Sequence, residues 1–291
     1  MKQIIAIVTA LITLFLTACE PIGTPEKTEA PTTITTTTAA APVVTVYGES
    51  FEAVPKSVVC LSPALVEMIY EEKAEAYLVG VGQYCDYPET AMIDHPVCGS
   101  AANPDFEAIK ALSPELLLTQ SPIATKDLTA LHAAGVRVLV IPAVKTVSDI
   151  QTLYDSLAEL FEVPTVTLPE LMMMPLLSSW RMGDFVYYLS DDLTAAGDDT
   201  FAGNFFSGYG TNLCEGKSEE IPDPDRAETI ILPAYLEHLA ESFSIVTEEE
   251  TETIPPHIIV LSEESSKLLE RPTSRVQDVL SEVTEKWMTT Q

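Results

Sequence analysis

The chain has 291 residues, of which 46% are hydrophobic and 20% charged, a composition that supports a folded core and excludes wholesale disorder. Acidic residues number 44 against 15 basic ones, so the formal net charge is −29. Such a chain is repelled by nucleic-acid phosphates and by anionic membrane surfaces, and its sequence contains no basic patch. We therefore expect no nucleic-acid partner.

The N-terminus has the pattern of an export signal. Lys2 precedes an apolar stretch from residue 4 to residue 18, which is shorter than the roughly 20 residues of a membrane-spanning helix. The ending Leu16-Thr17-Ala18-Cys19 resembles a bacterial lipobox. It predicts that residues 1–19 are a lipoprotein signal peptide and that Cys19 carries a lipid anchor on the outer face of the cell membrane. The alternative is an ordinary signal peptide with an incidental cysteine.

Residues 20–45 are rich in threonine and proline and show neither a helical nor a strand period. Segments of this composition stay solvated and extended. We expect this stretch to be a tether between the lipid and the folded part of the chain.

The next hundred residues alternate short apolar runs with helical stretches. Strands are expected at 57–61, 78–81, 116–119 and 136–141. Helices are expected to start at Pro63, with Ser62 as N-cap, and at Asn103-Pro104, and a third is expected over 126–134. This alternation predicts a parallel sheet flanked by helices, the N-terminal lobe of residues 46–145. Ligands of such sheets bind at the carboxyl ends of the strands, here the loops 62–63, 82–88 and 120–122.

A single helix is expected to follow this lobe. Residues 146–161 have apolar side chains at helical spacing, and Thr146 with Asp149 forms a capping-box pattern. Three prolines then interrupt regular structure, so we expect a bridging helix with its connector over 146–180.

The C-terminal lobe is expected over residues 181–291. Strands are expected at 185–189 and 258–261, a helix over 201–207, a closing helix over 274–287 capped by Ser274 and Gln277, and acidic surface loops at 215–229 and 247–256. The predicted fold class is α/β, with two Rossmann-like lobes that contain parallel sheets and are joined by one bridging helix.

Four cysteines remain besides Cys19, namely Cys60, Cys85, Cys98 and Cys214. An even number in an exported chain allows two disulfides in three pairings. A chain of this length needs no disulfide scaffold, and Cys60 lies in an apolar run, so we expect free or singly bridged thiols.

Six segments of the N-terminal lobe form an ordered set of motifs: Val58–Pro63, Leu78–Val81, Tyr84–Pro88, Gly99-Ser100, Asn103–Ile109 and Ala111–Leu118. In order and spacing they resemble the cobalamin and iron-chelate substrate-binding proteins of ABC importers. The C-terminal lobe agrees more loosely, through Val186–Tyr188, Ala196-Gly197, Thr200–Gly203 and Gly210–Asn212.

The resemblance implies a two-lobed, monomeric receptor that holds a corrinoid or iron chelate between its lobes and delivers it to an ABC permease and its ATPase. It implies no catalysis and no cofactor of the protein's own, although the ligand can carry cobalt or iron. The Tyr-Cys-Asp-Tyr-Pro loop looks most like that of cobalamin-type members. The stretch 213–257 does not align with the family.

The resemblance also suggests site residues. Tyr84 and Tyr87 are expected as aromatic walls for a flat macrocycle, with Ser62, Gln120 and Phe201 as further ligand contacts. The alternative for each tyrosine is that it only shapes its loop.

Docking residues follow from the same resemblance. Glu107 stands where members of the family carry a glutamate that pairs with permease arginines, although it also complements the dipole of its helix. The second-lobe glutamate is left open between Glu228 and Glu237.

Charge gives an independent expectation about the ligand. Of the five arginines, only Arg181 is expected near the hinge or the second-lobe site. A protein this acidic with few cations near its site should prefer a neutral or cationic ligand.

Four rival functions remain. An enzyme would start from Ser62 or from the Asp191-Asp192 and Asp198-Asp199 pairs, but no histidine stands at a telling spacing, and Ser62 is explained as an N-cap. A direct metal receptor would need more ligands than His95 and Cys98. An adhesive or wall-associated lipoprotein of the same fold, or a receptor for haem or another metal chelate, is the alternative to corrinoid uptake.

Overall fold

The computed structural model describes residues 45–47, 53–168, 180–221, 226–243 and 255–289. All of these belong to one compact unit that begins at Ala40. The predicted signal peptide with Cys19, the tether up to residue 44 and the connector residues 169–179 lie outside the described residues.

The first sheet has five strands in the order β1-β5-β4-β2-β3. Its strands are β1 (Thr45–Tyr47), β2 (Val58–Cys60), β3 (Leu78–Val81), β4 (Leu116–Thr119) and β5 (Arg137–Val140). Strands β2 to β5 pair in parallel, and β1 joins β5 antiparallel. Strand β1 begins at the last residue of the stretch expected as tether. This sheet and its helices are termed the N-terminal lobe.

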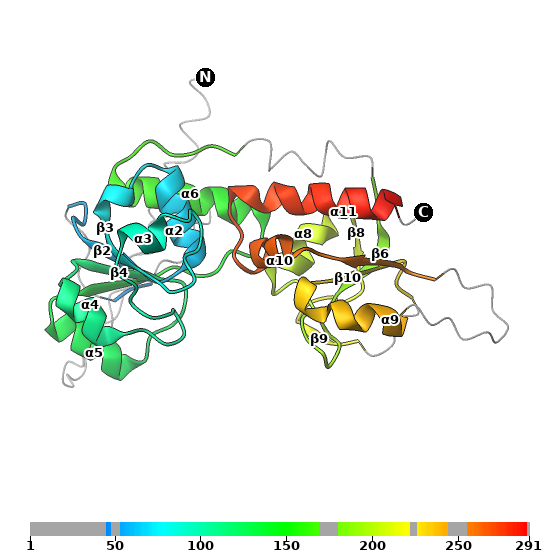
Figure 1. Cartoon of the computed structure of the whole chain (residues 1–291), viewed down its shortest axis with the longest axis horizontal. Helices are drawn as coiled ribbons and strands as arrows, with labels where there is room; N and C mark the ends of the chain where they lie inside the picture. Colours follow the sequence, from blue (N-terminus) through cyan, green and yellow to red (C-terminus); the bar gives the residue numbers. More distant parts are fainter. Residues whose placement is uncertain (1–44, 48–52, 169–179, 222–225, 244–254, 290–291) are drawn as a thin grey trace, which may run out of the picture. The chain divides into compact units, whose positions relative to one another are not determined.

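Alternate residues of the strands β2, β4 and β5 belong to different cores. On β4, Leu116 and Leu118 face one core and Leu117 faces another. Helix α2 (Pro63–Glu71) packs on the first of these faces, and α4 (Phe106–Leu112) and α5 (Thr125–Ala133) pack on the second. Figure 1 shows α4 and α5 together on one side of the sheet.

The second sheet contains four parallel strands in the order β11-β10-β6-β8. These are β6 (Gly183–Tyr187), β8 (Gly210–Asn212), β10 (Thr229–Leu232) and β11 (His257–Val260), and a small antiparallel pair joins β7 (Thr194–Ala195) to β9 (Glu219–Glu220). This sheet and its helices are termed the C-terminal lobe. The two parallel sheets confirm the predicted fold class.

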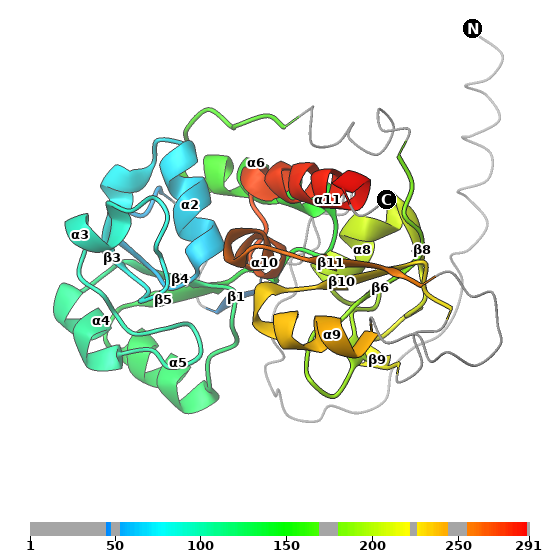
Figure 2. The ribbon, with the colours of Figure 1, turned by 45° about the vertical axis from the view of Figure 1, so that its right-hand side comes forward.

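Helices cover both faces of the second sheet. One face carries α8 (Phe201–Ser207), α10 (Glu263–Glu270) and α11 (Gln277–Thr289), and the other carries η2 (Ala234–Leu239) and α9 (Ala240–Phe243). Both views show α11 on the same side as α8 and opposite α9 (Figures 1 and 2).

Helix α6 (Val147–Phe161) lies between the two sheets in sequence. The predicted capping box is confirmed, because the Thr146 hydroxyl accepts from the Asp149 amide and the Asp149 carboxylate accepts from the Thr146 amide. Its buried side chains Leu153, Leu157 and Phe161 belong to the same core as β4 and β6. A single apolar core therefore runs from the first sheet through α6 to the second.

Several element predictions were wrong in detail. Helix α4 begins at Phe106 and not at Asn103, because Asp105 is its N-cap and accepts a hydrogen bond from Ala108 N. The closing helix starts as the 3₁₀ turn η3 (Ser274–Val276), whose N-cap is Thr273 rather than Ser274. Strand β6 ends at Tyr187 rather than residue 189.

Other elements were missed. Strand β10 starts at the end of the stretch expected to be an acidic surface loop, and it lies inside the second sheet between β11 and β6. Helix α10 and the segment from η2 to α9 were not predicted either.

The described cysteines Cys60, Cys85, Cys98 and Cys214 are buried free thiols. Within the described ranges, no helix has the length and apolarity needed to cross a bilayer.

One carboxylate is buried without a clear partner. Glu72 follows α2 and is 3% exposed, and neither of its oxygens has a hydrogen-bond partner among the described residues. Burial, the strongest influence, raises its pKa to about 7, the Val166 backbone offsets part of this effect, and the carboxylates of Asp155 and Glu71 add to it.

Candidate functional site

The loops that follow β2, β3 and β4 meet at the carboxyl edge of the first sheet, as the sequence predicted. Ser62 directly precedes α2 and Gln120 follows β4. The Ser62 hydroxyl does not cap its helix; its oxygen accepts a hydrogen bond from the Gln120 amide at 2.7 Å. The structure therefore brings these two predicted site residues together. Ser62 is the N-cap residue of α2, as predicted, although its side chain makes no capping hydrogen bond. Because Ser62 is 2% exposed, its main visible role is to tie the two loops.

The tyrosine loop, residues 82–88, follows β3. Gly82 N donates to Cys60 O at 2.9 Å, and Gln83 N donates to Gly99 O at 2.7 Å, which fixes the start of the loop. Tyr84 is 62% exposed and Tyr87 is 43% exposed, whereas Cys85 between them is buried. Two aromatic rings thus stand at the edge where ligands of parallel sheets bind.

A cationic segment of the C-terminal lobe contacts this loop. The Arg271 guanidinium lies 2.7 Å from the Asp86 carboxylate and donates to the Tyr84 carbonyl at 2.8 Å. The Lys267 ammonium lies 3.5 Å from Asp86. Burial opposes ionisation of Asp86, but the charge and hydrogen bond of Arg271, with the charge of Lys267, hold the pKa of Asp86 below its ordinary value.

Arg275 extends the same contact toward α2. Its guanidinium carbon lies 3.8 Å from the centre of the Tyr87 ring, within the range of a cation–π contact. It also lies 3.4 Å from Glu67, which accepts a hydrogen bond from the Thr273 hydroxyl. Burial raises the pKa of Glu67, while Thr273 and Arg275 counteract this effect.

These contacts correct an expectation about charge. The sequence suggested that Arg181 alone lies near the site, whereas Arg271 and Arg275 contact the tyrosine loop itself. The sequence did not reveal their importance because they are far from the loop along the chain. Arg271 is the C-cap of helix α10, which was not predicted, and Arg275 lies in the η3 turn that begins the closing helix. The predicted preference for a neutral or cationic ligand rested partly on a lack of cations near the site. The positions of Arg271 and Arg275 remove that part of the argument.

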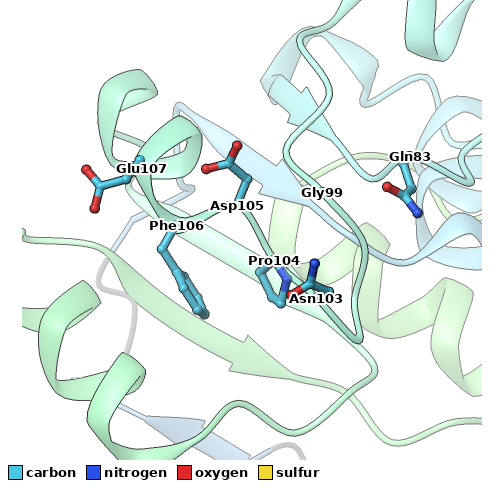
Figure 3. A pocket seen from close by; sticks show the side chains of 7 residues that line it. All are labelled: Gln83, Gly99, Asn103, Pro104, Asp105, Phe106 and Glu107. Carbon is cyan, nitrogen blue, oxygen red and sulfur yellow. The ribbon is translucent and has the colours of Figure 1, made fainter.

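A hollow of about 540 Å³ adjoins the start of the tyrosine loop. It is lined by Gln83, Gly99, Asn103, Pro104, Asp105, Phe106 and Glu107. Figure 3 shows Gln83 on one side of it, Glu107 on the other, and Asn103 with Pro104 between them. Glu107, the predicted docking residue, lies in the first turn of α4 and makes an exposed ion pair with Lys110 at 2.5 Å.

The C-terminal lobe presents a different aromatic residue from the one predicted. Phe201 is 5% exposed and stacks on Phe205, so its role as a ligand contact rests on the sequence expectation alone. Tyr235 follows the carboxyl end of β10 and is 52% exposed. Its hydroxyl donates to the Leu189 carbonyl at 3.2 Å. Tyr235 was not predicted as a site residue because strand β10 was not predicted. The apolar run Ile-Ile-Leu-Pro that precedes Tyr235 was the signal that could have identified the strand.

The two candidate docking glutamates of this lobe lie at opposite edges of the sheet. Glu228 immediately precedes β10, whereas Glu237 lies in η2 after that strand. Glu237 is therefore the one on the same edge of its sheet as the loops predicted to contact the ligand. Among the described residues, no group of three or more His, Cys, Asp or Glu side chains is arranged to hold a metal ion.

Comparisons with known proteins agree with this architecture. Residues 58–165 match the family described as periplasmic binding protein. No significant match was found among curated protein sequences.

Solved structures match over most of the chain. The periplasmic vitamin B12-binding protein BtuF of Vibrio cholerae is 17% identical, with a TM-score of 0.59, 82% of this chain covered and 98% of that one. A possible iron-binding periplasmic protein of Staphylococcus epidermidis is 16% identical, with a TM-score of 0.60 and coverages of 80% and 99%. The periplasmic haem-binding protein RhuT of Roseiflexus sp. RS-1 is 17% identical, with a TM-score of 0.56 and coverages of 81% and 98%. At these identities the likeness shows a shared fold. Residues 58–165 therefore carry the sequence signature of the periplasmic binding protein family, and the described residues share the fold of these solved proteins.

Proposed function

We propose that the chain is the extracytoplasmic receptor of an ABC importer and captures a corrinoid or an iron chelate, haem included, between its two lobes. The observation that carries this proposal is the fold, shared over nearly the whole length of solved proteins described as binding vitamin B12, iron or haem. The chain performs no reaction and needs no cofactor in this role, since cobalt or iron arrives with the ligand.

The ligand would lie at the carboxyl edges of the two sheets. Tyr84 and Tyr87 offer exposed ring surface from the N-terminal lobe, and Tyr235 offers it from the C-terminal lobe. Exposed aromatic faces suit a flat macrocycle because they bury large apolar area on stacking. Gln120, held against Ser62, supplies a polar group beside them.

Delivery would use the acidic lobe tips. Glu107 on α4 and Glu237 on η2 are both exposed, and both follow carboxyl ends of strands in their sheets. A carboxylate on each lobe could pair with cationic side chains of the permease, which carries the ATPase on its other side. Lipidation at Cys19, with residues 20–45 as tether, would keep the receptor, as a monomer, on the outer face of the membrane beside this permease.

The test is a thermal-shift screen of the full chain in detergent against cyanocobalamin, dicyanocobinamide, haemin and a ferric hydroxamate siderophore. A ligand that binds only the native state and is present at a concentration 100 times its dissociation constant stabilises that state by about 2.7 kcal/mol. We expect a shift with at least one of these probes, and a smaller shift in Tyr84→Ala and Tyr87→Ala. Ile93→Ala is the matched control, since Ile93 is an exposed apolar residue of the same lobe outside the tyrosine loop. No shift with any probe would contradict the ligand class and favour the adhesive or wall-associated role.

A further inference from the structure

Three cations of the C-terminal lobe are spaced four residues apart: Lys267, Arg271 and Arg275. They are a fifth of the 15 basic residues in a chain with 44 acidic ones. All three make contacts with acidic or aromatic side chains of the N-terminal lobe. Positive charge, which is scarce in this chain, is thus concentrated against the tyrosine loop.

Arg271 makes the most complete contact. One of its nitrogens pairs with the Asp86 carboxylate and another donates to the Tyr84 carbonyl, so it holds the loop by both side chain and backbone. Its own side chain is 22% exposed, which shields the pair from full solvation. A guanidinium is suited to this task because its planar fork presents several donors at once.

Within the N-terminal lobe the loop is anchored at its start by the Gly82 and Gln83 amides and by Cys85, which is buried in the core. Within the described part of the chain, the backbone of residues 84–87 makes one hydrogen bond inside its own lobe, from Cys85 N to Gly82 O at 3.2 Å. The other contacts of these residues described above come from Arg271, Lys267 and Arg275. The charged contacts that orient the two exposed tyrosines therefore come from the opposite lobe.

Arg275 also decides which surface of Tyr87 is available. Its guanidinium covers one face of the ring at 3.8 Å, so a ligand can stack only on the other face. Glu67 and Glu264 hold Arg275 in turn. The cation thus orients the ring and is itself fixed.

We propose that Arg271 and Arg275 are positioning residues, which hold the tyrosine loop from the C-terminal lobe in the conformation that receives the ligand. This inference rests on the proposed function for its ligand, but the holding of the loop is independent of it. The sequence offers no sign of this relation, because 187 positions separate Arg271 from Tyr84.

Cys85 provides a readout that needs no ligand. Its thiol is fully buried within the loop, and burial raises its pKa to about 12, so alkylation is slow while the loop is held. Cys214, also buried, lies in the C-terminal lobe and reports global opening. The experiment compares iodoacetamide labelling of both thiols by peptide-resolved mass spectrometry of the full chain in detergent.

The variants are Arg271→Ala, Asp86→Asn, their double variant, Arg271→Lys and the control Arg226→Ala, which removes an exposed arginine of the same lobe. We expect Arg271→Ala to raise the Cys85 rate about tenfold, as for loss of a hydrogen bond to a charged group, with Cys214 unchanged. The double variant should add little to the single ones, because both remove the same contact. Arg271→Lys should restore part of the protection, and Arg226→Ala should change nothing.

A Cys85 rate within twofold of wild type in Arg271→Ala would overturn the inference. If both thiols react faster, Arg271→Ala has loosened the whole chain, and Arg271→Lys becomes the test. A faster Cys85 rate with an unchanged Cys214 rate in Arg271→Lys supports the inference, and a Cys85 rate within twofold of wild type overturns it. Arg275→Gln should in addition weaken binding of the probe that stabilises the wild type by several fold; unchanged affinity would remove Arg275 from the proposal. If Cys85 responds and no probe binds wild type, the loop is held as inferred and the proposed ligand class fails.

Discussion

Replacing Glu72 with glutamine should change how stability depends on pH. Glu72 is 3% exposed, and its pKa is raised from 4.5 to about 7, chiefly by burial. Between these two values the unfolded chain releases a proton that the folded chain retains. Stability contributed by this group is therefore present below about pH 4.5 and is lost as the pH rises toward 7.

The size of the effect follows from the shift. A difference of about 2.5 pKa units corresponds to about 3 kcal/mol, since one unit is worth 1.36 kcal/mol. Glutamine cannot ionise, so Glu72→Gln removes this dependence and keeps nearly the same volume. Relative to wild type, the variant should gain about 3 kcal/mol between pH 4 and pH 8, whatever its offset at pH 4.

The assay is urea unfolding of both proteins at several pH values from 4 to 8, with the difference in unfolding free energy plotted against pH. Glu159→Gln is the matched control, because Glu159 is an exposed carboxylate on the neighbouring helix α6. A difference between Glu72→Gln and wild type that stays flat across this range would refute the reasoning, since it would mean that Glu72 is ionised in the folded protein as easily as in the unfolded one.

Three further outcomes follow from the structure. Burial alone would raise the pKa of Glu282, but the hydrogen bonds that it accepts from Ser262 and its ion pair with Lys286 lower it to about 2. Urea unfolding should therefore find Glu282→Gln about 3 kcal/mol less stable than wild type at pH 7, and this difference should vanish as the pH falls from 4.5 toward 2. Ile231→Ala on the missed strand β10 should cost about 2–5 kcal/mol by the same method, because the side chain is fully buried in the shared core, and a loss below 1 kcal/mol would contradict that placement. Gly99→Ala should lower the melting temperature, because Gly99 has φ of +79° and an added Cβ would lie 2.6 Å from the Asn103 carbonyl oxygen; an unchanged melting temperature would show that the hollow's rim tolerates the methyl group.

Local signals were enough to predict the N-terminal lobe. Strands such as 116–119 are short apolar runs between turn residues, and their bounds match β4. The capping box at Thr146 needs only neighbours in sequence, so it too could be predicted. The rule for parallel sheets then pointed to the loops 62–63, 82–88 and 120–122, which the structure places at the carboxyl edge of the first sheet, while their role in ligand binding stays a prediction.

The C-terminal lobe was harder because its signals are not local. Strand β10 follows an acidic, proline-bearing stretch, so its four apolar residues were not separated from a loop. Helix α10 starts with Glu263 and Glu264, so its sequence resembles another acidic segment. Only the structure shows that Leu268 and Leu269 are buried in the core.

The contacts of the candidate site were hard to predict for the same reason. Exposure of Tyr84 and Tyr87 fits their expected position, but the burial of Phe201 depends on how α8 packs against the sheet. The contact of Arg271 with Asp86 joins residues from different lobes, and no spacing rule applies to such a pair.

The central claim is that this chain binds a corrinoid or iron chelate at the tyrosine loop. An equilibrium titration of the full chain in detergent, with cyanocobalamin and haemin followed by absorbance, tests it most directly. The account predicts saturable binding of one ligand per chain for at least one probe, and a loss of at least tenfold in affinity when Tyr84 and Tyr87 are both changed to alanine. Binding that the double tyrosine variant leaves unchanged, or no saturable binding at all, would contradict it.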